Sequence, residues 1–287
     1  VCGVHLTRKI VLIGLAVVGT LAIVVGLSVG LTIGGSGGSN SADAYSQHSG
    51  NAKKEERYWS IGQAIESAGV GKEIFDENTT DFQALVWLAE HDKHNLPVDA
   101  PVEIIIQRFA VASLYFALSG PSWTKSYNFL NKHHECSWND GNAGIFCSDS
   151  GQLVTQIILP SSNLAGTIPK TIGLLGHIWE LDLHGNMIEG SIPNSVGVLT
   201  DLLNIQLSKN QLDGSIPPSI AMLKNLTHCN LFGNKLSGTS HASFANLPKL
   251  VGLNLDSNQL TGPLGALGQV PTLEYLWIGH NELDSLP

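Results

Sequence analysis

Five asparagines recur at an almost constant interval in the second half of the chain. Asn186, Asn210, Asn234 and Asn258 lie 24 residues apart, and Asn281 follows after 23. Each closes a segment of the form L-x-x-L-x-L-x-x-N, in which isoleucine or cysteine replaces some leucines. A fixed period in this range indicates a solenoid, because a single turn cannot bury its apolar face and several turns have to stack. We therefore expect a repeat domain over residues 154–287, incomplete at its C-terminal end.

The spacing also assigns each side chain to one side of the turn. Side chains alternate between the two faces of a strand, so Leu181 and Leu183 are expected to point into the solenoid. The residues between and beside them then point outward. The asparagine falls where the chain bends inward, and its amide can pair with backbone groups that would otherwise be buried without a partner.

Three turns continue after the bend with one motif, and its copies are Gly166-Thr167-Ile168-Pro169, Gly190-Ser191-Ile192-Pro193 and Gly214-Ser215-Ile216-Pro217. They resemble the plant-type leucine-rich repeat, whose signature is L-x-G-x-I-P. The resemblance implies an α/β solenoid of about six repeats. It also implies a right-handed, curved fold that binds proteins, peptides or glycans on its concave side. The fourth and fifth turns depart from the motif after Gly238 and Gly262, where Phe244, Leu247, Leu267 and Val270 are expected to serve as core anchors.

Residues 59–153 precede the repeats and are expected to form a helical N-terminal cap. Thr80 and Gln83 have the spacing of a capping box, so a helix is expected to start there. Pro101 suits the first turn of a later helix and Gly120 its end. Between them, apolar residues repeat at helical spacing at Val102, Ile105, Ile106, Phe109 and Phe116.

The end of this segment carries Trp123, Cys136-Ser137-Trp138 and Cys147. That order resembles the N-terminal cap of plant-type leucine-rich-repeat proteins, and stretches 84–88 and 107–110 look like membrane-anchored algal members of the group. A zinc site is the alternative, since His133 and His134 adjoin Cys136. Zinc sites use four ligands at compact spacings, and a fourth ligand is missing here. We expect a Cys136–Cys147 disulfide, which suits an exported domain, and neither a metal nor a cofactor.

The remaining composition narrows the function classes. Cys229 occupies a core leucine position and is expected to be a free, buried thiol. The chain carries no recognisable order of catalytic residues, and we do not expect an enzyme. Its net charge is −9, with no basic block beyond Lys53-Lys54, so nucleic acid is not an expected partner.

An uncharged apolar stretch near the N-terminus predicts a membrane span over residues 10–34. A cleaved signal peptide is the alternative, but the apolar stretch is longer than such peptides use. Arg8 and Lys9 precede the span, which places a short tail, 1–9, in the cytosol and the repeats outside the cell or in a lumen. A glycine pattern at Gly26, Gly30 and Gly34 could pair two such helices in a homodimer. Residues 35–58 are expected to be a flexible linker.

The expected ligand-binding residues are the outward side chains of the repeat strands. Exposed aromatic residues dominate interface hot spots. The aromatic end of this surface, with Phe232, Tyr275 and Trp277, is therefore expected to contact the ligand. The acidic end, with Glu180, Asp182 and His184, is expected to be peripheral. Two sequons predict glycans at Asn78 and Asn225, with Asn225 expected to be exposed. The predicted binding residues are Glu180, Asp182, His184, Gln206, Asn230, Phe232, Asn254, Asp256, Tyr275 and Trp277.

Together these features predict a single-pass, receptor-like recognition protein that binds a protein, peptide or glycan ligand. Two alternatives stay open. The chain could be the ectodomain fragment of a receptor kinase, whose catalytic domain would carry a lysine-bearing strand, H-R-D and D-F-G. It could also be a scaffold subunit of a membrane complex, because the leucine-rich-repeat fold hosts many functions.

Overall fold

The structure is a computed structural model that describes residues 52–263, 267 and 270–285. The predicted cytosolic tail, the span 10–34 and the glycines Gly26, Gly30 and Gly34 lie outside the described residues. Within the described part of the chain, no helix combines the length and the apolar character that a membrane crossing needs.

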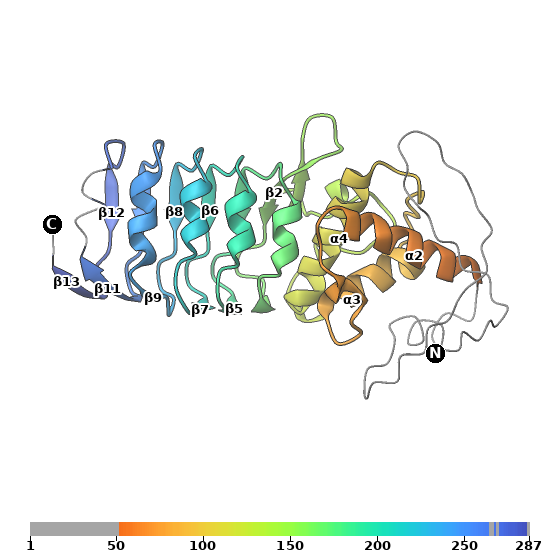
Figure 1. Ribbon diagram of the computed structural model, residues 1–287, viewed down its shortest axis with the longest axis horizontal. Helices are drawn as coiled ribbons and strands as arrows, with labels where there is room; N and C mark the ends of the chain where they lie inside the picture. Colours follow the sequence, from red (N-terminus) through yellow and green to blue (C-terminus); the bar gives the residue numbers. More distant parts are fainter. Residues whose placement is uncertain (1–51, 264–266, 268–269, 286–287) are drawn as a thin grey trace, which may run out of the picture. The chain divides into compact units, whose positions relative to one another are not determined.

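The repeats are built on a seven-stranded sheet. Its strands, in spatial order, are β1 (Gly144–Cys147), β2 (Val154–Ile158), β4 (Glu180–Asp182), β6 (Asn204–Gln206), β8 (His228–Asn230), β10 (Gly252–Asn254) and β12 (Tyr275–Trp277). From β2 to β12 every neighbouring pair is parallel, and only β1 runs antiparallel to its partner. Figure 1 shows these strands side by side along the repeats. The predicted α/β solenoid is therefore confirmed.

The chain returns along the other side of each turn through short strands and 3-10 helices. The return strands form two three-stranded sheets, β3 (Ala165–Thr167), β5 (Met187–Gly190) and β7 (Gln211–Leu212), and β9 (Ser237–Gly238), β11 (Gln259–Pro263) and β13 (Glu282–Ser285). The helices are η5 (Lys170–Leu174), η6 (Asn194–Val198), η7 (Pro218–Met222) and η8 (Ser240–Asn246). Pro169, Pro193 and Pro217 stand immediately before η5, η6 and η7. Their restricted φ explains why the repeated Ile-Pro motif starts a tight turn at that point.

The repeated asparagines have the predicted role. Asn210 is buried; its Nδ2 donates to the carbonyls of Leu183 and Leu207 at 3.0 and 3.1 Å, and its Oδ1 accepts from the amide of Ile188 at 3.0 Å. Asn234 and Asn258 repeat these bonds one turn further along each time. Each amide thus joins its own turn to the preceding one.

The two irregular turns continue the core as expected. Phe244 and Leu247 are buried in the fourth turn, and Leu267 and Val270 in the fifth. Asn281 comes one residue early but still donates to Leu255 and Ile278 carbonyls. Apolar anchors therefore preserve the stack where the Ile-Pro motif is lost.

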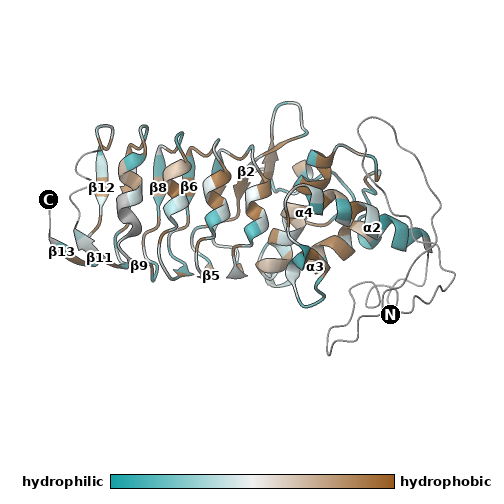
Figure 2. Cartoon of the chain, viewed as in Figure 1, coloured by the Kyte–Doolittle hydropathy of each residue, from teal (hydrophilic) through white to brown (hydrophobic). Residues whose placement is uncertain are grey.

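The cap contains three α-helices, and its start differs from the expectation. α2 (Ala52–Ser67) begins inside the predicted linker 35–58, and its first turns are hydrophilic (Figure 2). It is followed by η1 (Lys72–Phe75), α3 (Thr80–Val86), a π-helical turn η2 (Trp87–His91) and α4 (Val102–Ala117). Arg57 was expected to belong to the flexible linker, but it donates from its NH1 to the carbonyl of Leu96 at 2.6 Å and from Nε to the carbonyl of Ala89 at 3.1 Å. Arg57 thereby supplies donors to carbonyls at and beyond the end of η2.

Both predicted helix ends in the cap shift slightly. The N-cap of α3 is Thr79, not Thr80, because the Thr79 hydroxyl accepts the amide of Phe82. α4 ends at Ala117, and Ser119 adopts a left-handed φ of 57° before Gly120 starts another turn. Val102 is exposed rather than buried, whereas Gln107 and Arg108 are buried. α4 is covered on most sides by α2, α3 and η5, so its burial does not follow one apolar stripe.

A buried ionic cluster joins the cap to β2. Arg108 makes a bidentate bond to Asp92, with N···O distances of 2.6 and 2.8 Å, and its NH1 donates to Glu135 at 2.7 Å. Gln107 donates to Glu135 at 2.7 Å and accepts the amide of Val154 at 2.7 Å. Hydrogen bonds therefore run without a break from the centre of the cap into β2.

Candidate recognition surface

The open face is the outward side of β4, β6, β8, β10 and β12 together with the residue two positions beyond each strand. Burial alternates along β4 and β6, where the central leucine or isoleucine is buried and its neighbours are partly exposed. The structure places all ten predicted binding residues on this face. Tyr275 and Trp277 are exposed, and the other eight are half-buried. The placement follows from strand alternation; ligand contact by these residues stays a prediction.

At the end near the cap, the open face carries carboxylates that are held in place. Both oxygens of Glu180 accept hydrogen bonds, from Gln156 at 2.7 Å and from Asn204 at 3.0 Å. Asp182 pairs with the ring of His184 at 2.7 Å. The two carboxylates are thus held in fixed orientations by neighbouring side chains.

At the far end, the open face carries a stacked aromatic pair. The rings of Tyr275 and Trp277 are nearly parallel, with an interplanar angle of 9° and centroids 5.8 Å apart, and each residue is 52% exposed. Leu276 between them occupies an inward position yet is 37% exposed, on the last strand of the sheet. Phe232 was expected to be exposed with the other aromatics but is half-buried.

Asp256 lies on the open face, two residues beyond the end of β10. Its carboxylate accepts from the Ser257 hydroxyl at 2.6 Å and approaches the ring of His280 at 3.2 Å. The Ser257 hydrogen bond lowers the pKa of Asp256, burial opposes this effect, and the hydrogen bond and charge of His280 lower the pKa further. This carboxylate is therefore an anion at neutral pH, on the turn next to the one that carries the aromatic pair.

Sequence reasoning missed two apolar side chains beside this face. Trp179 and Leu203 hold equivalent positions just before β4 and β6 and are 38% and 40% exposed. The amide of Leu203 donates to the Trp179 carbonyl at 2.9 Å, so the two residues lie on adjacent turns. Alternation within the strands does not cover the residue that precedes them, but the 24-residue spacing of two large apolar residues was a readable signal. In the opposite sense, Ser208 lies two residues beyond β6, a position of the open face, but is buried.

Comparisons with known proteins agree with this geometry. The family model described as Leucine Rich Repeat matches residues 177–199 and 225–247. Phytosulfokine receptor 2 of Arabidopsis thaliana is 38% identical over 79 residues, which is 27% of this chain and 7% of that receptor. The crystal structure of the Arabidopsis receptor kinase HAESA ectodomain, in complex with an N-terminally extended IDA peptide hormone, is similar with a TM-score of 0.56 and 30% identity, over 63% of this chain and 30% of that one.

A second solved structure, PEPR1–AtPEP1, has a TM-score of 0.53 and 30% identity over 61% of this chain and 24% of that chain. The repeats are plant-type leucine-rich repeats. The solved relatives that carry the comparison are ectodomains or complexes of plant receptors. The chain spans only a small part of the curated receptor that it matches.

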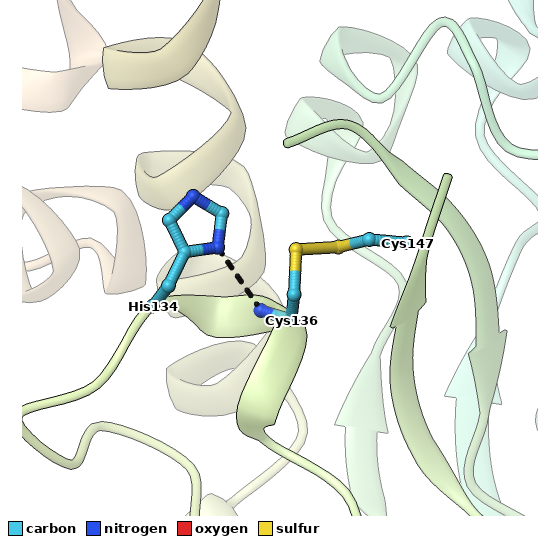
Figure 3. A group of neighbouring side chains, drawn as sticks. All are labelled: His134, Cys136 and Cys147. Carbon is cyan, nitrogen blue, oxygen red and sulfur yellow. Dashed lines mark hydrogen bonds between the residues drawn. A yellow bond between two sulfur atoms is a disulfide. The ribbon is translucent and has the colours of Figure 1, made fainter. Parts of the chain in front are cut away.

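The cap of this leucine-rich-repeat protein contains the predicted disulfide. Cys136 and Cys147 are bonded, with Cα atoms 5.4 Å apart, and among the described cysteines Cys229 is free and buried. His134 lies beside the bond and its Nδ1 accepts the amide of Cys136 at 3.3 Å (Figure 3). Both sulfurs that the zinc alternative would use are therefore joined to each other, not available as thiolates.

The two sequons differ in their surroundings. Asn78 is exposed, in the turn before α3. Asn225 is only partly exposed, contrary to expectation: its Nδ2 donates to the Thr200 carbonyl at 3.0 Å and its Oδ1 accepts from Lys249 at 2.8 Å. A glycan at Asn225 would have to replace a bond between adjacent turns, so Asn78 is the more accessible acceptor.

Proposed function

We propose that this chain is a receptor-like recognition protein that binds a peptide or protein ligand on the open face of its seven-stranded sheet, without catalysis. The observation that carries the proposal is the exposed Tyr275–Trp277 stack on a face whose polar side chains are already held in place. Aromatic side chains that the core does not use are those that interface hot spots favour. The solved relatives include a receptor ectodomain bound to a peptide hormone, which supports a peptide as the ligand class.

The ligand contacts the aromatic end, and the acidic end near the cap is peripheral. Tyr275 and Trp277 offer large, nearly rigid surfaces that lose little conformational entropy on binding. Glu180 and Asp182 are instead engaged with protein partners, so a ligand has to compete for them.

The proposal includes a membrane anchor at residues 10–34 with the N-terminus in the cytosol and the repeats outside the cell or in a lumen. The support is the length of the apolar stretch and the position of Arg8 and Lys9. A protease-protection assay on sealed membranes tests the topology. Digestion of the repeats from the cytosolic side would contradict it.

Site-specific photo-crosslinking of the full chain, expressed in its own cells, tests the binding face. We place a benzophenone amino acid at Asn230, on the open face, or at Glu189, which is exposed on return strand β5. A ligand that binds as proposed crosslinks to position 230 and not to position 189. Equal crosslinking at the two positions, or crosslinking at position 189 alone, would overturn the assignment of the face.

A further inference from the structure

A groove of about 400 Å³ lies between the cap and the first repeats, on the side of the return helices and away from the open face. One wall is the loop Ala68–Gly71 that follows α2, with Glu73 and Asp81 beside it. The other wall comes from η5 and η6. The residues of these two helices that line the groove are Lys170, Thr171, Gly173, Leu174, Ser195 and Val198.

Asp81 is the polar side chain around which the groove is built. Its Oδ1 accepts from the hydroxyl of Ser113 on α4, and the hydroxyl of Thr171 on η5 lies 3.5 Å from the same atom. Ser113 and Thr171 are buried and their hydroxyls lie 2.7 Å apart. No hydrogen bond to Oδ2 is present among the described residues. One oxygen is therefore fixed by the protein, and the other remains available to a donor in the groove.

The charges around the groove favour a cation. α2 ends at Ser67, directly before the loop that forms one wall of the groove. The C-terminal end of a helix is the negative end of its dipole and attracts positive charge. The last turn of α2 contains no basic residue that would compensate it. Burial raises the pKa of Asp81, and the nearby carboxylate of Glu73 adds to that rise. Against these, Lys170 is the single basic side chain among the described residues that line the groove.

The rest of the lining suits a short aliphatic stem. Val70, Leu174 and Val198 supply apolar surface in the same groove. Val198 is 57% exposed, so most of its side-chain surface is free to contact a ligand in the groove. The hydroxyl oxygen of Ser195 is buried and has no hydrogen-bond partner within the described part of the chain. A ligand with a hydrogen-bond donor at the end of an apolar stem would pack on the apolar lining and offer a donor to the polar oxygens of the groove.

We propose that this groove binds an ammonium group on an aliphatic stem, supplied by a lysine side chain of a peptide or by a free aliphatic amine. The ammonium group pairs with Oδ2 of Asp81, and the stem packs on Leu174 and Val198. The site is separate from the open face, so it gives the protein a second binding function that does not depend on the first.

Ligand-observed NMR titrations with the full chain in detergent micelles test the site. The probes are cadaverine, N-acetyl-lysine N-methylamide, and the uncharged analogue N-acetyl-norleucine N-methylamide. We expect at least one amine to bind and the norleucine analogue to bind about tenfold more weakly. Cadaverine alone would identify a free amine as the source, and the lysine amide alone a peptide side chain.

Two variants make the test specific. Asp81→Asn should weaken amine binding about tenfold, whereas Lys170→Met should strengthen it about two- to fivefold, because it removes a competing positive charge. Lys170 is exposed, so its replacement is not expected to disturb folding and remains informative if Asp81→Asn is unstable. Unchanged amine affinity in Lys170→Met, or equal binding of the norleucine analogue, would overturn the proposal.

Discussion

The guanidinium carbon of Arg108 lies 4.8 Å from the ring centre of Trp138, in the interior of the cap. Trp87 contributes a second ring, 5.3 Å from the same carbon. Asp92 and Glu135 form ion pairs with Arg108, and all three side chains are fully buried. A cation enclosed by two indoles and two carboxylates has no access to water, so the cluster is stable only while every member is present.

Arg108→Met should lower the free energy of unfolding by about 3–5 kcal/mol, because Asp92 and Glu135 would remain buried without their partner. Urea unfolding followed by circular dichroism measures the change. Lys125→Met is the matched control: its ion pair with Asp140 is exposed, and its loss should cost less than about 1 kcal/mol. A similar small loss for Arg108→Met would show that the carboxylates find other partners.

Asn210→Ala should lower the free energy of unfolding by about 1–3 kcal/mol, because it takes the acceptor from the buried amide of Ile188. It also removes one of the two asparagine donors that each of the Leu183 and Leu207 carbonyls has. Asn204→Ala, a few residues earlier but on the open face, should cost less than about 1 kcal/mol. Both values come from the same denaturant titration. If the two variants were equally stable, the buried asparagines would not be what joins the turns.

The two structural features behind these predictions differ in whether the sequence alone could predict them. The repeated asparagines and their bonds between turns, here called the asparagine ladder, were predictable because each asparagine bonds to backbone groups at a constant distance along the chain. The Arg108 cluster was not, because its partners Asp92 and Glu135 are 16 and 27 residues away along the chain, outside the α-helices and strands. A basic residue within the apolar helix α4 indicated that some partner exists but could not identify it. Likewise, Arg57 was expected to belong to a flexible linker, and only the tertiary position of η2 explains why it points inward.

Cys229 should be inert to iodoacetamide at pH 8 in the folded protein and reactive after unfolding. Burial raises the pKa of its thiol to about 12. A raised folded-state pKa means that stability is fully present below the unfolded pKa of 9.0 and falls as the pH rises from there towards about 12. Mass spectrometry of labelled peptides measures the reactivity. The Cys136–Cys147 peptide should appear intact without reductant, and free thiols at these positions would contradict the disulfide.

Trp277→Ala should weaken ligand binding by about 1–2 kcal/mol, since it removes half of the exposed aromatic stack. Asp182→Ala should change affinity little. Both variants are titrated with the ligand that the crosslinking experiment identifies. Unfolding curves show that each variant is folded. Unchanged affinity for Trp277→Ala together with a loss for Asp182→Ala would move the contact surface to the end near the cap.

Glycan occupancy should be higher at Asn78 than at Asn225 when the full chain passes through the secretory pathway. Asn78 is exposed, whereas the amide of Asn225 already bridges Thr200 and Lys249 on adjacent turns. Glycopeptide mass spectrometry gives the occupancy of each site. Lys249→Ala, which removes one of the two bonds, should raise occupancy at Asn225; no change there would mean that exposure is not what limits it.

The asparagine ladder also makes the repeats interchangeable. Asn210 bonds to one carbonyl and one amide of the preceding turn, and Asn234 bonds to the equivalent atoms one turn later. Excising one whole 24-residue unit, such as residues 187–210, would bring Asn234 to the Leu183 carbonyl in place of Leu207, while its bonds to Leu231 and Leu212 are kept. The reach of the ligand-facing surface can thus lengthen or shorten by whole units while the interior stays the same. Such a protein can change the size of what it recognises through duplication or loss of a gene segment, without first solving a new packing problem.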